Sequence, residues 1–222
     1  MSAYLYLEGG GTGAGSKYLS IRCQEGFHKL LERMGFIGRK PRLVACGGRG
    51  VVYDGFVIEH SARVADYVAM WIDSEEPMIN PEAAWEHLQN VATVPQWQRP
   101  EGARDDQVLF MTTCMETWIL ADRDALSGHY GSKLQESALP PLVDLEKRER
   151  HDVQAKLEHA TRNCTNSYAK GKRSFEVLSR LTPAVLEQHL PSFVRVRRIL
   201  NAHLYRLEAA MPTSDTTARN IG

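Results

Sequence analysis

Acidic side chains at the ends of two predicted strands carry the clearest chemistry in this chain. Glu8 closes the first strand-like run of the sequence, and Asp73 and Glu75 follow a second run, residues 67–72, that is apolar throughout. Side chains alternate with a period of two in an extended chain, so Asp73 and Glu75 are expected on the same side. An apolar run of strand length suits a central strand that is covered by helices on both faces.

The three carboxylates predict a divalent metal site. Carboxyl ends of parallel strands meet at one edge of a sheet, where α/β proteins place their sites, so Glu8 is expected beside Asp73 and Glu75. Clustered carboxylates repel one another unless a cation neutralises them, and oxygen ligands of this kind favour Mg²⁺ or Mn²⁺. The alternative is a solvated acidic turn after the second run, with Glu8 merely exposed at the end of the first.

Three further side chains are candidates for the same chemistry. Glu116 lies at the fourth strand–helix junction and could supply another carboxylate at this edge; an acid favoured by the helix dipole is the alternative. Lys170 and Lys172 belong to the densest basic patch, residues 168–173. Either lysine could hold a phosphate and stabilise charge in a transition state. The alternative is that this segment is a solvated loop.

A glycine-rich loop, residues 9–17, follows the first strand and precedes a helix, as phosphate-binding loops do. A Walker A loop needs Gly-Lys-Ser/Thr in succession, but the order is Gly15-Ser16-Lys17, and Ala14 interrupts the dinucleotide-binding spacing. The glycines are therefore expected to let the backbone pass close to the metal site or to a phosphate. A nucleotide-binding phosphotransferase that uses Lys17 is a further hypothesis.

The elements that position these residues alternate between strand and helix. Strands are predicted at 3–8, 42–46, 67–72 and 107–112, with helices at 16–34, 51–65 and 81–91 and another beginning at 114. This order predicts an α/β fold with a mainly parallel sheet sandwiched by helices.

After about residue 131 the sequence shows only helical patterns and loops. We therefore predict an α/β domain over 1–131, a helical extension packed on it over 132–211, and a disordered tail over 212–222. The closing helix is expected at 193–210. Its arginine stripe is interpreted as a solvated face rather than a surface for nucleic acid; the stripe consists of Arg195, Arg197 and Arg198.

Composition narrows the class of protein. The 222 residues are 43% apolar, which is enough for a full core, and 27 basic residues balance 27 acidic ones. A net charge of zero argues against wholesale electrostatic binding of nucleic acid, although a local basic face is still possible. Four scattered cysteines without a CxxC pair predict reduced thiols in a cytoplasmic protein. We expect no signal peptide, because Met1 leads directly into a predicted strand. We expect no membrane partner, because no apolar run approaches the roughly 18 residues of a membrane span.

Four segments together resemble domain-of-unknown-function family 4276: residues 6–9, 71–75, 114–122 and 168–176. The resemblance covers nearly the whole chain, and that family is similar to the Toprim group. In Toprim domains a Glu after the first strand and an Asp-x-Asp after the third hold Mg²⁺. Glu8 and Asp73 match this pattern, and Glu75 stands in place of the second aspartate, with a reach longer by one methylene.

The resemblance implies phosphodiester chemistry and an ABC/AAA-type ATPase partner in a dimer or larger oligomer. The leading hypothesis is a Mg²⁺-dependent Toprim-like nuclease, the effector of a prokaryotic anti-phage defence system, that acts on DNA or RNA. Glu8, Asp73 and Glu75 would hold one or two ions that activate water. Glu116 would assist them, and Lys170 or Lys172 would steady the scissile phosphate. The alternative is a non-catalytic regulatory subunit of an ATPase complex with a vestigial acidic site.

Overall fold

The computed structural model describes residues 2–11, 15–63, 65–91 and 97–205, and the side chain of Lys172 is not described. The predicted tail at 212–222, and the part of the predicted closing helix beyond 205, lie outside these residues. None of the helices in the described ranges combines the length and apolar character that crossing a membrane requires.

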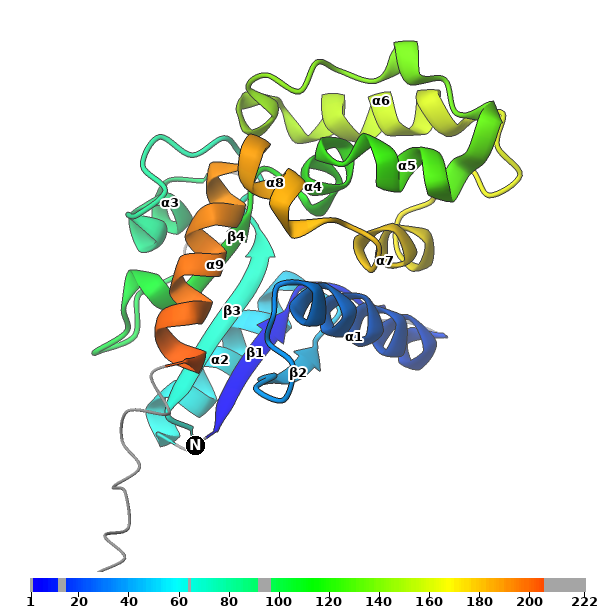
Figure 1. The fold of residues 1–222 in the computed structure, drawn as a ribbon. Helices are drawn as coiled ribbons and strands as arrows, with labels where there is room; N and C mark the ends of the chain where they lie inside the picture. Colours follow the sequence, from blue (N-terminus) through cyan, green and yellow to red (C-terminus); the bar gives the residue numbers. More distant parts are fainter. Residues whose placement is uncertain (1, 12–14, 64, 92–96, 206–222) are drawn as a thin grey trace, which may run out of the picture.

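Four parallel strands form one sheet in the order β2-β1-β3-β4, which confirms the predicted α/β fold and is consistent with a Toprim-like architecture (Figure 1). The strands are β1 (Ala3–Leu7), β2 (Arg42–Ala45), β3 (Tyr67–Asp73) and β4 (Val108–Met111). Every residue of β3 is buried, as its apolar sequence predicted. Leu7 pairs with Trp71, and Asp73 with Met111, so β1, β3 and β4 end at a common edge.

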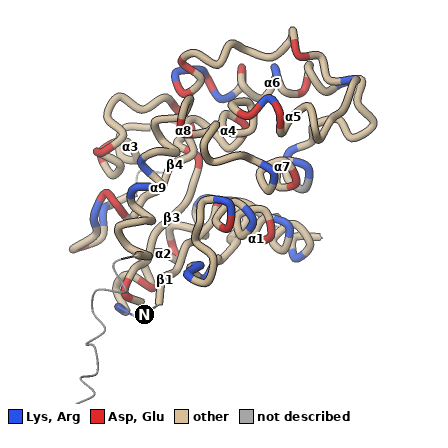
Figure 2. Tube along the Cα trace, viewed as in Figure 1, with Lys and Arg blue, Asp and Glu red and all other residues tan. Residues whose placement is uncertain are grey.

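Helices come after the strands in the chain, as predicted, and the limits of the predicted helices are shifted by only a few residues. Those of the α/β part are α1 (Ser16–Arg33), α2 (Arg49–Ala62), α3 (Ala84–Asn90), α4 (Met115–Ala121) and α5 (Arg123–Tyr130). The later ones are α6 (Arg150–Thr161), α7 (Lys172–Leu178), α8 (Pro183–His189) and α9 (Pro191–Leu204). Short 3-10 turns occupy Asp105–Gln107, Gly131–Lys133, Glu136–Ala138 and Leu145–Lys147. Figure 2 shows charges of both signs along α1, α6 and α7, in keeping with the balanced composition.

The two faces of the sheet belong to two separate hydrophobic cores, because successive side chains of a strand point to opposite faces. Trp71 lies on one face, where its ring meets that of Phe27 of α1 with centroids 4.9 Å apart. Met70 lies on the other face, in a core with Phe56 of α2 and Trp85 of α3. Helices therefore cover the sheet on both sides.

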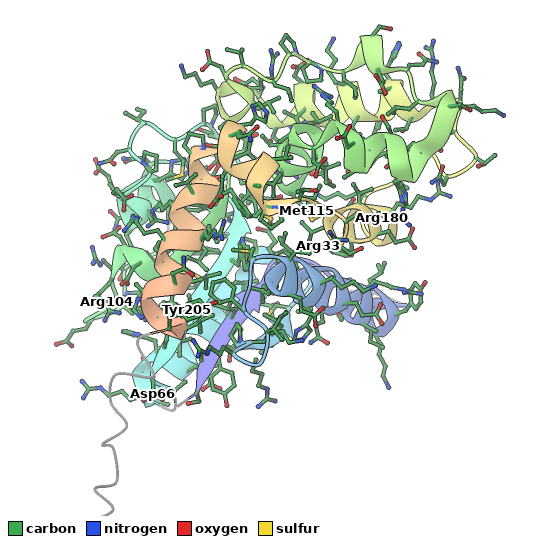
Figure 3. All side chains as sticks on the ribbon, in the orientation of Figure 1. Arg33, Asp66, Arg104, Met115, Arg180 and Tyr205 are labelled. Carbon is green, nitrogen blue, oxygen red and sulfur yellow. The ribbon has the colours of Figure 1, made fainter. Side chains whose placement is uncertain are left out.

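The later helices share the first of these cores. Helix α6 lies beyond the carboxyl ends of the strands, whereas α9 runs back alongside β3 and β4 (Figure 1). Trp118 of α4 packs against Phe193 of α9, with ring centroids 5.0 Å apart. Helix α7 lies so close to α1 that a Cβ at Gly26 would come within 2.9 Å of the carbonyl oxygen of Phe175. Figure 3 labels Met115 at the carboxyl end of the sheet and Asp66 at the opposite end.

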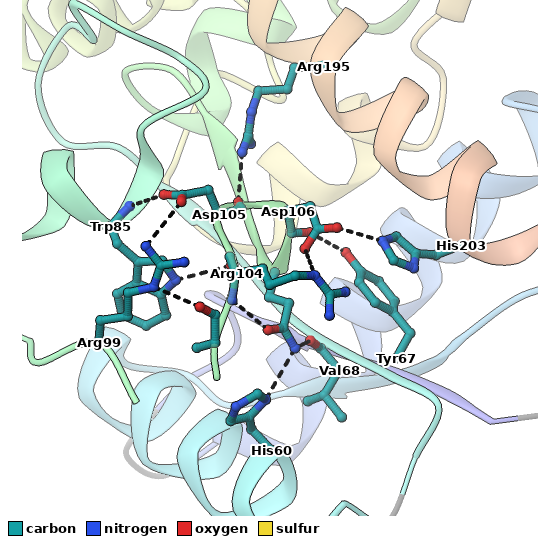
Figure 4. Close-up of polar contacts among 12 residues, drawn as sticks. His60, Tyr67, Val68, Trp85, Arg99, Arg104, Asp105, Asp106, Arg195 and His203 are labelled. Atoms are coloured by element: carbon teal, nitrogen blue, oxygen red, sulfur yellow. Dashed lines mark hydrogen bonds and ion pairs between the residues drawn. The ribbon is translucent and has the colours of Figure 1, made fainter. Parts of the chain in front are cut away.

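The prediction that the arginine stripe of the last helix is a solvated face is wrong at Arg195. Only 5% of this residue is exposed, and its guanidinium donates to the carbonyl oxygens of Val108 at 2.8 Å and Asp105 at 2.7 Å. Figure 4 shows the contact with Asp105. It fastens α9 to the start of β4 and is not part of a solvated face. Arg197 and Arg198 are more exposed, and each is paired with a glutamate.

Glu146 gives the fold a pH dependence. Its carboxylate accepts hydrogen bonds from the backbone N–H of Ser192, at 3.0 and 3.1 Å, and from the Ser192 hydroxyl. Burial raises the pKa of Glu146 from 4.5 to about 7, although the Ser192 bonds oppose the rise. The folded protein thus binds this proton more tightly than the unfolded chain, so Glu146 lowers stability as pH rises from about 4.5 to about 7.

Glu146→Gln is therefore expected to increase the free energy of unfolding at pH 8, by at most about 3 kcal/mol, and by much less at pH 5. An amide keeps an acceptor for Ser192 and carries no charge. Urea unfolding at the two pH values measures the difference. Glu149→Gln, at an exposed position nearby, is the control and should change little at either pH. An equal effect of Glu146→Gln at both pH values would contradict the prediction.

Candidate metal centre

Three acidic residues that are distant in the sequence meet at the carboxyl edge of the sheet. Glu8 directly follows β1, and its N–H continues the ladder by donating to Trp71 O at 3.0 Å. The backbone N–H of Asp73, the last residue of β3, donates to Glu8 Oε2 at 3.2 Å. One carboxylate oxygen from each of Glu8, Asp73 and Glu75 lies within 4.8 Å of the other two. The predicted proximity of these three residues is therefore confirmed.

Asp73 is the most buried member, with 8% of the residue exposed. The N–H of Met115, at the start of α4, donates to Asp73 Oδ1 at 2.9 Å. Burial raises the pKa of the Asp73 carboxyl well above its ordinary value, and the neighbouring charges of Glu8 and Glu116 raise it further. A cation at this place would favour the ionised form, because it offsets both the desolvation and the repulsion.

Glu75 reaches the cluster by a route that differs from the prediction. Strand β3 ends at Asp73, and Glu75 has a left-handed backbone with φ of 69°. Its N–H donates to Thr113 O at 2.9 Å, which holds the turn beyond the strand. The alternation expected of an extended chain therefore does not apply at this residue, although its carboxylate still lies with the other two.

Two arginines neutralise part of the acidic charge. Nη1 of Arg49 lies 3.3 Å from Glu8 Oε2, 3.7 Å from Glu75 Oε1 and 2.6 Å from the carbonyl oxygen of Asp73. Arg150, from α6, forms an ion pair with the other oxygen of Glu75, Oε2. The sequence reasoning missed both residues. Arg49 could have been predicted from the sequence, because it closely follows β2 and therefore lies at the same edge of the sheet.

A cavity of about 240 Å³ opens beside the cluster. Glu8, Asp73, Glu116 and Lys170 line it, whereas Glu75 is not among its lining residues. The side chain of Lys172, the first residue of α7, is not described. A larger cavity of about 610 Å³ lies at the amino end of the sheet, around His60, but its lining does not include any of these acids. The smaller cavity is therefore the candidate site, because three of the acidic residues and Lys170 line it and none of them lines the larger one.

Glu116 is almost fully buried, with 1% of the residue exposed, and the helical extension holds it in place. The hydroxyl of Tyr168 donates to Glu116 Oε1 at 2.5 Å, and Gln154 Nε2 lies 3.4 Å from Oε2. Burial raises the pKa of the Tyr168 phenol far above its ordinary value, and Glu116 adds to the rise, so the hydroxyl stays a donor. The sequence reasoning placed Tyr168 at the head of the basic patch without a role, and it missed Gln154.

The glycines bring two loops together at the rim of the cavity. Gly9 N–H donates to Gly47 O at 3.2 Å, and Gly47 N–H donates to Gly9 O at 2.7 Å. Gly9 has φ of 145°, and a Cβ there would lie 2.9 Å from both Cys23 Sγ and Phe175 Cζ. Residues 12–14 of the predicted loop lie outside the described residues. The described glycines fit the expectation that they let the backbone pass close to the acidic cluster.

The donor set fits a divalent cation. Three carboxylates whose oxygens converge within 4.8 Å are hard ligands of the kind that Mg²⁺ and Mn²⁺ take. Among the described residues, none of the four cysteines belongs to a group of side chains that could hold a metal ion, and three of the four are buried. Burial raises the pKa of Cys114 well above its ordinary value, which argues against a thiolate nucleophile there.

One family model matches the chain. It is described as a domain of unknown function (DUF4276), and it covers residues 13–201. The matched range contains Asp73, Glu75, Glu116 and Lys170, and Glu8 precedes it. No curated protein and no solved structure matches the chain.

Proposed function

The chain belongs to the DUF4276 family, as the sequence resemblance predicted, and from this premise we propose that it is a Mg²⁺- or Mn²⁺-dependent nuclease that hydrolyses phosphodiester bonds. The observation that supports the proposal is the convergence of Glu8, Asp73 and Glu75 beside a cavity that also contains a lysine. Carboxylates with a nearby cationic side chain suit a negatively charged phosphodiester bound through a metal.

In this proposal Glu8 and Asp73 are the ligands that face the cavity, and Glu75 is the third. A bound divalent ion supplies positive charge that lowers the pKa of water and stabilises charge on the phosphate. Lys170, which lines the same cavity, binds a non-bridging phosphate oxygen, and Lys172 is a second candidate for this contact. Because Lys170 is exposed at the cavity, it can reach a polymer that enters from solvent.

Glu116 is proposed to accept the proton of the attacking water. Tyr168 occupies its Oε1 with a short hydrogen bond, whereas Oε2 has only the long contact to Gln154 at 3.4 Å. Oε2 is thus the oxygen that is able to take up a proton. A buried carboxylate fixed in this way suits general base catalysis, which requires a defined position close to the reacting atoms.

The resemblance supports a wider setting for the activity. We propose that the protein is a Toprim-like effector subunit of a prokaryotic anti-phage defence system, that it works in the cytoplasm, and that it assembles with an ABC/AAA-type ATPase in an oligomer. DNA and RNA are both retained as substrates.

A second candidate function rests on Arg49 and Arg150. Both arginines pair with acids of the cluster, so part of its negative charge is already neutralised within the protein. A regulatory subunit with a vestigial site would keep such pairs permanently. This subunit would bind its ATPase partner without cutting nucleic acid.

A cleavage assay on the purified full chain, with and without its ATPase partner, tests the proposal. Single- and double-stranded DNA, tRNA and a longer RNA are incubated with Mg²⁺ or Mn²⁺. We expect cleavage of at least one substrate, and excess EDTA should stop it. Calorimetry with Mn²⁺ accompanies the assay. Absence of both Mn²⁺ binding and cleavage would favour the vestigial site and contradict the nuclease.

A further inference from the structure

Arg49 occupies the centre of the acidic cluster. It is the first residue of α2, directly after the Gly47-Gly48 turn, and its side chain is only 10% exposed. A single nitrogen, Nη1, lies within 4 Å of oxygens from all three acidic residues. The distances are 3.3 Å to Glu8, 3.7 Å to Glu75 and 2.6 Å to the carbonyl of Asp73. The guanidinium therefore contacts the same residues that form the candidate cation site.

A divalent cation and this guanidinium cannot both be accommodated there at low cost. The carboxylate oxygens of Glu8, Asp73 and Glu75 lie within 4.8 Å of one another, so an ion bound to them would come close to Nη1. Two positive charges a few ångströms apart repel strongly at a site that is largely shielded from water. The repulsion weakens metal binding unless the arginine moves away.

The remaining contacts of Arg49 are few. Its Nε and Nη2 atoms are buried and have no hydrogen-bond partner among the described residues. The guanidinium lies over the ring of Trp97, with its carbon 5.0 Å from the ring centroid. Within the described part of the chain, Nη1 thus makes all of the hydrogen bonds of this side chain, and the contact with Trp97 is compatible with other rotations of the guanidinium.

We infer that Arg49 is a built-in competitor of the divalent cation: it neutralises Glu8 and Glu75 in the metal-free protein and must withdraw when a cation binds. The inference rests on the proposed metal site and deepens it. Arg49 sets the metal affinity of the site by an internal charge, so the parent protein binds the cation more weakly than its three carboxylates alone would.

Calorimetric titration with Mn²⁺ alone tests this role in the full chain. Arg49→Met removes the charge and keeps an unbranched side chain that can pack on Trp97. We expect its dissociation constant for Mn²⁺ to fall at least about tenfold relative to the parent protein. Arg49→Lys keeps a positive charge and should stay closer to the parent. Arg42→Met is the matched control, because Arg42 packs over Tyr4 and pairs with no acid among the described residues; it should bind as the parent does.

Thermal unfolding gives a second readout that does not depend on activity. Arg49→Met should melt at a lower temperature than the parent without metal, and its melting temperature should rise more on addition of Mn²⁺. If Arg49→Met binds Mn²⁺ no more tightly than the parent, the competitor role is wrong while the metal site stands. If neither protein binds Mn²⁺, the metal site itself is wrong, and with it the proposed nuclease.

Discussion

Replacing Asp73 by asparagine is expected to lower the rate of metal-dependent cleavage by about a hundredfold to a thousandfold and to leave the protein folded. Asp73 is central to the cluster, since its backbone contacts Glu8 and Arg49 and its carboxylate faces the cavity. The amide has nearly the same shape and can still accept the hydrogen bond from Met115 N–H. It carries no negative charge, however, and is a much poorer ligand for a divalent cation.

The folded state should not suffer from this substitution. The pKa of Asp73 is raised because its charge is buried beside Glu8 and Glu116, so an uncharged side chain relieves repulsion. We therefore expect an unchanged or higher melting temperature for Asp73→Asn without metal, together with loss of Mn²⁺ binding by calorimetry. Glu8→Gln should lose cleavage and metal binding in the same way. Cleavage at the parental rate by both variants would contradict the assignment.

Asp66→Asn provides the matched control. Asp66 immediately precedes β3 at the opposite end of the sheet, where it accepts a hydrogen bond from Ser2 N at 2.8 Å (Figure 3). The same change of carboxylate to amide is thus made at the two ends of one strand. Cleavage and Mn²⁺ binding by Asp66→Asn should equal those of the parent, because this residue lies far from the acidic cluster along β3.

The sequence was sufficient to predict the sheet and the meeting of Glu8 with Asp73. Both follow from local information, namely apolar runs that stop at an acid, combined with the general rule that parallel strands end at one edge. The same rule would have placed Arg49 there, since it follows β2 after only a short turn. Arg49 was nevertheless not among the predicted site residues, which were acids and lysines.

Other parts of the site depend on packing between distant segments. Arg150 reaches Glu75, and Gln154 and Tyr168 reach Glu116, only because α6 and the segment before α7 lie over the ends of the strands. No local pattern fixes that arrangement. Arg195 was misjudged for a similar reason: its partners are the carbonyl groups of Asp105 and Val108, and such acceptors cannot be recognised from a helical repeat.

Tyr168→Phe is expected to slow cleavage about tenfold to a hundredfold, which is the usual range for residues that orient a ligand or base. The phenyl ring keeps the packing of a residue that is 9% exposed, so the substitution removes only the hydroxyl. Glu116 then loses the donor that fixes Oε1 at 2.5 Å, and its buried charge loses a strong hydrogen bond. The free energy of unfolding should fall by about 1.5–3 kcal/mol, as for other hydrogen bonds to charged groups.

The control for this substitution is Tyr130→Phe. Tyr130 is also buried, but its hydroxyl has no hydrogen-bond partner among the described residues. Its removal should leave cleavage unchanged and should not lower stability, since no bond is lost. A positioning role for Tyr168 predicts a lower kcat with little change in KM, whereas a merely structural role predicts lower stability at unchanged kcat. If Tyr168→Phe and Tyr130→Phe cleave at the same rate, the hydrogen bond from Tyr168 does not position Glu116 for catalysis. This result would contradict the proposal that Glu116 is the general base.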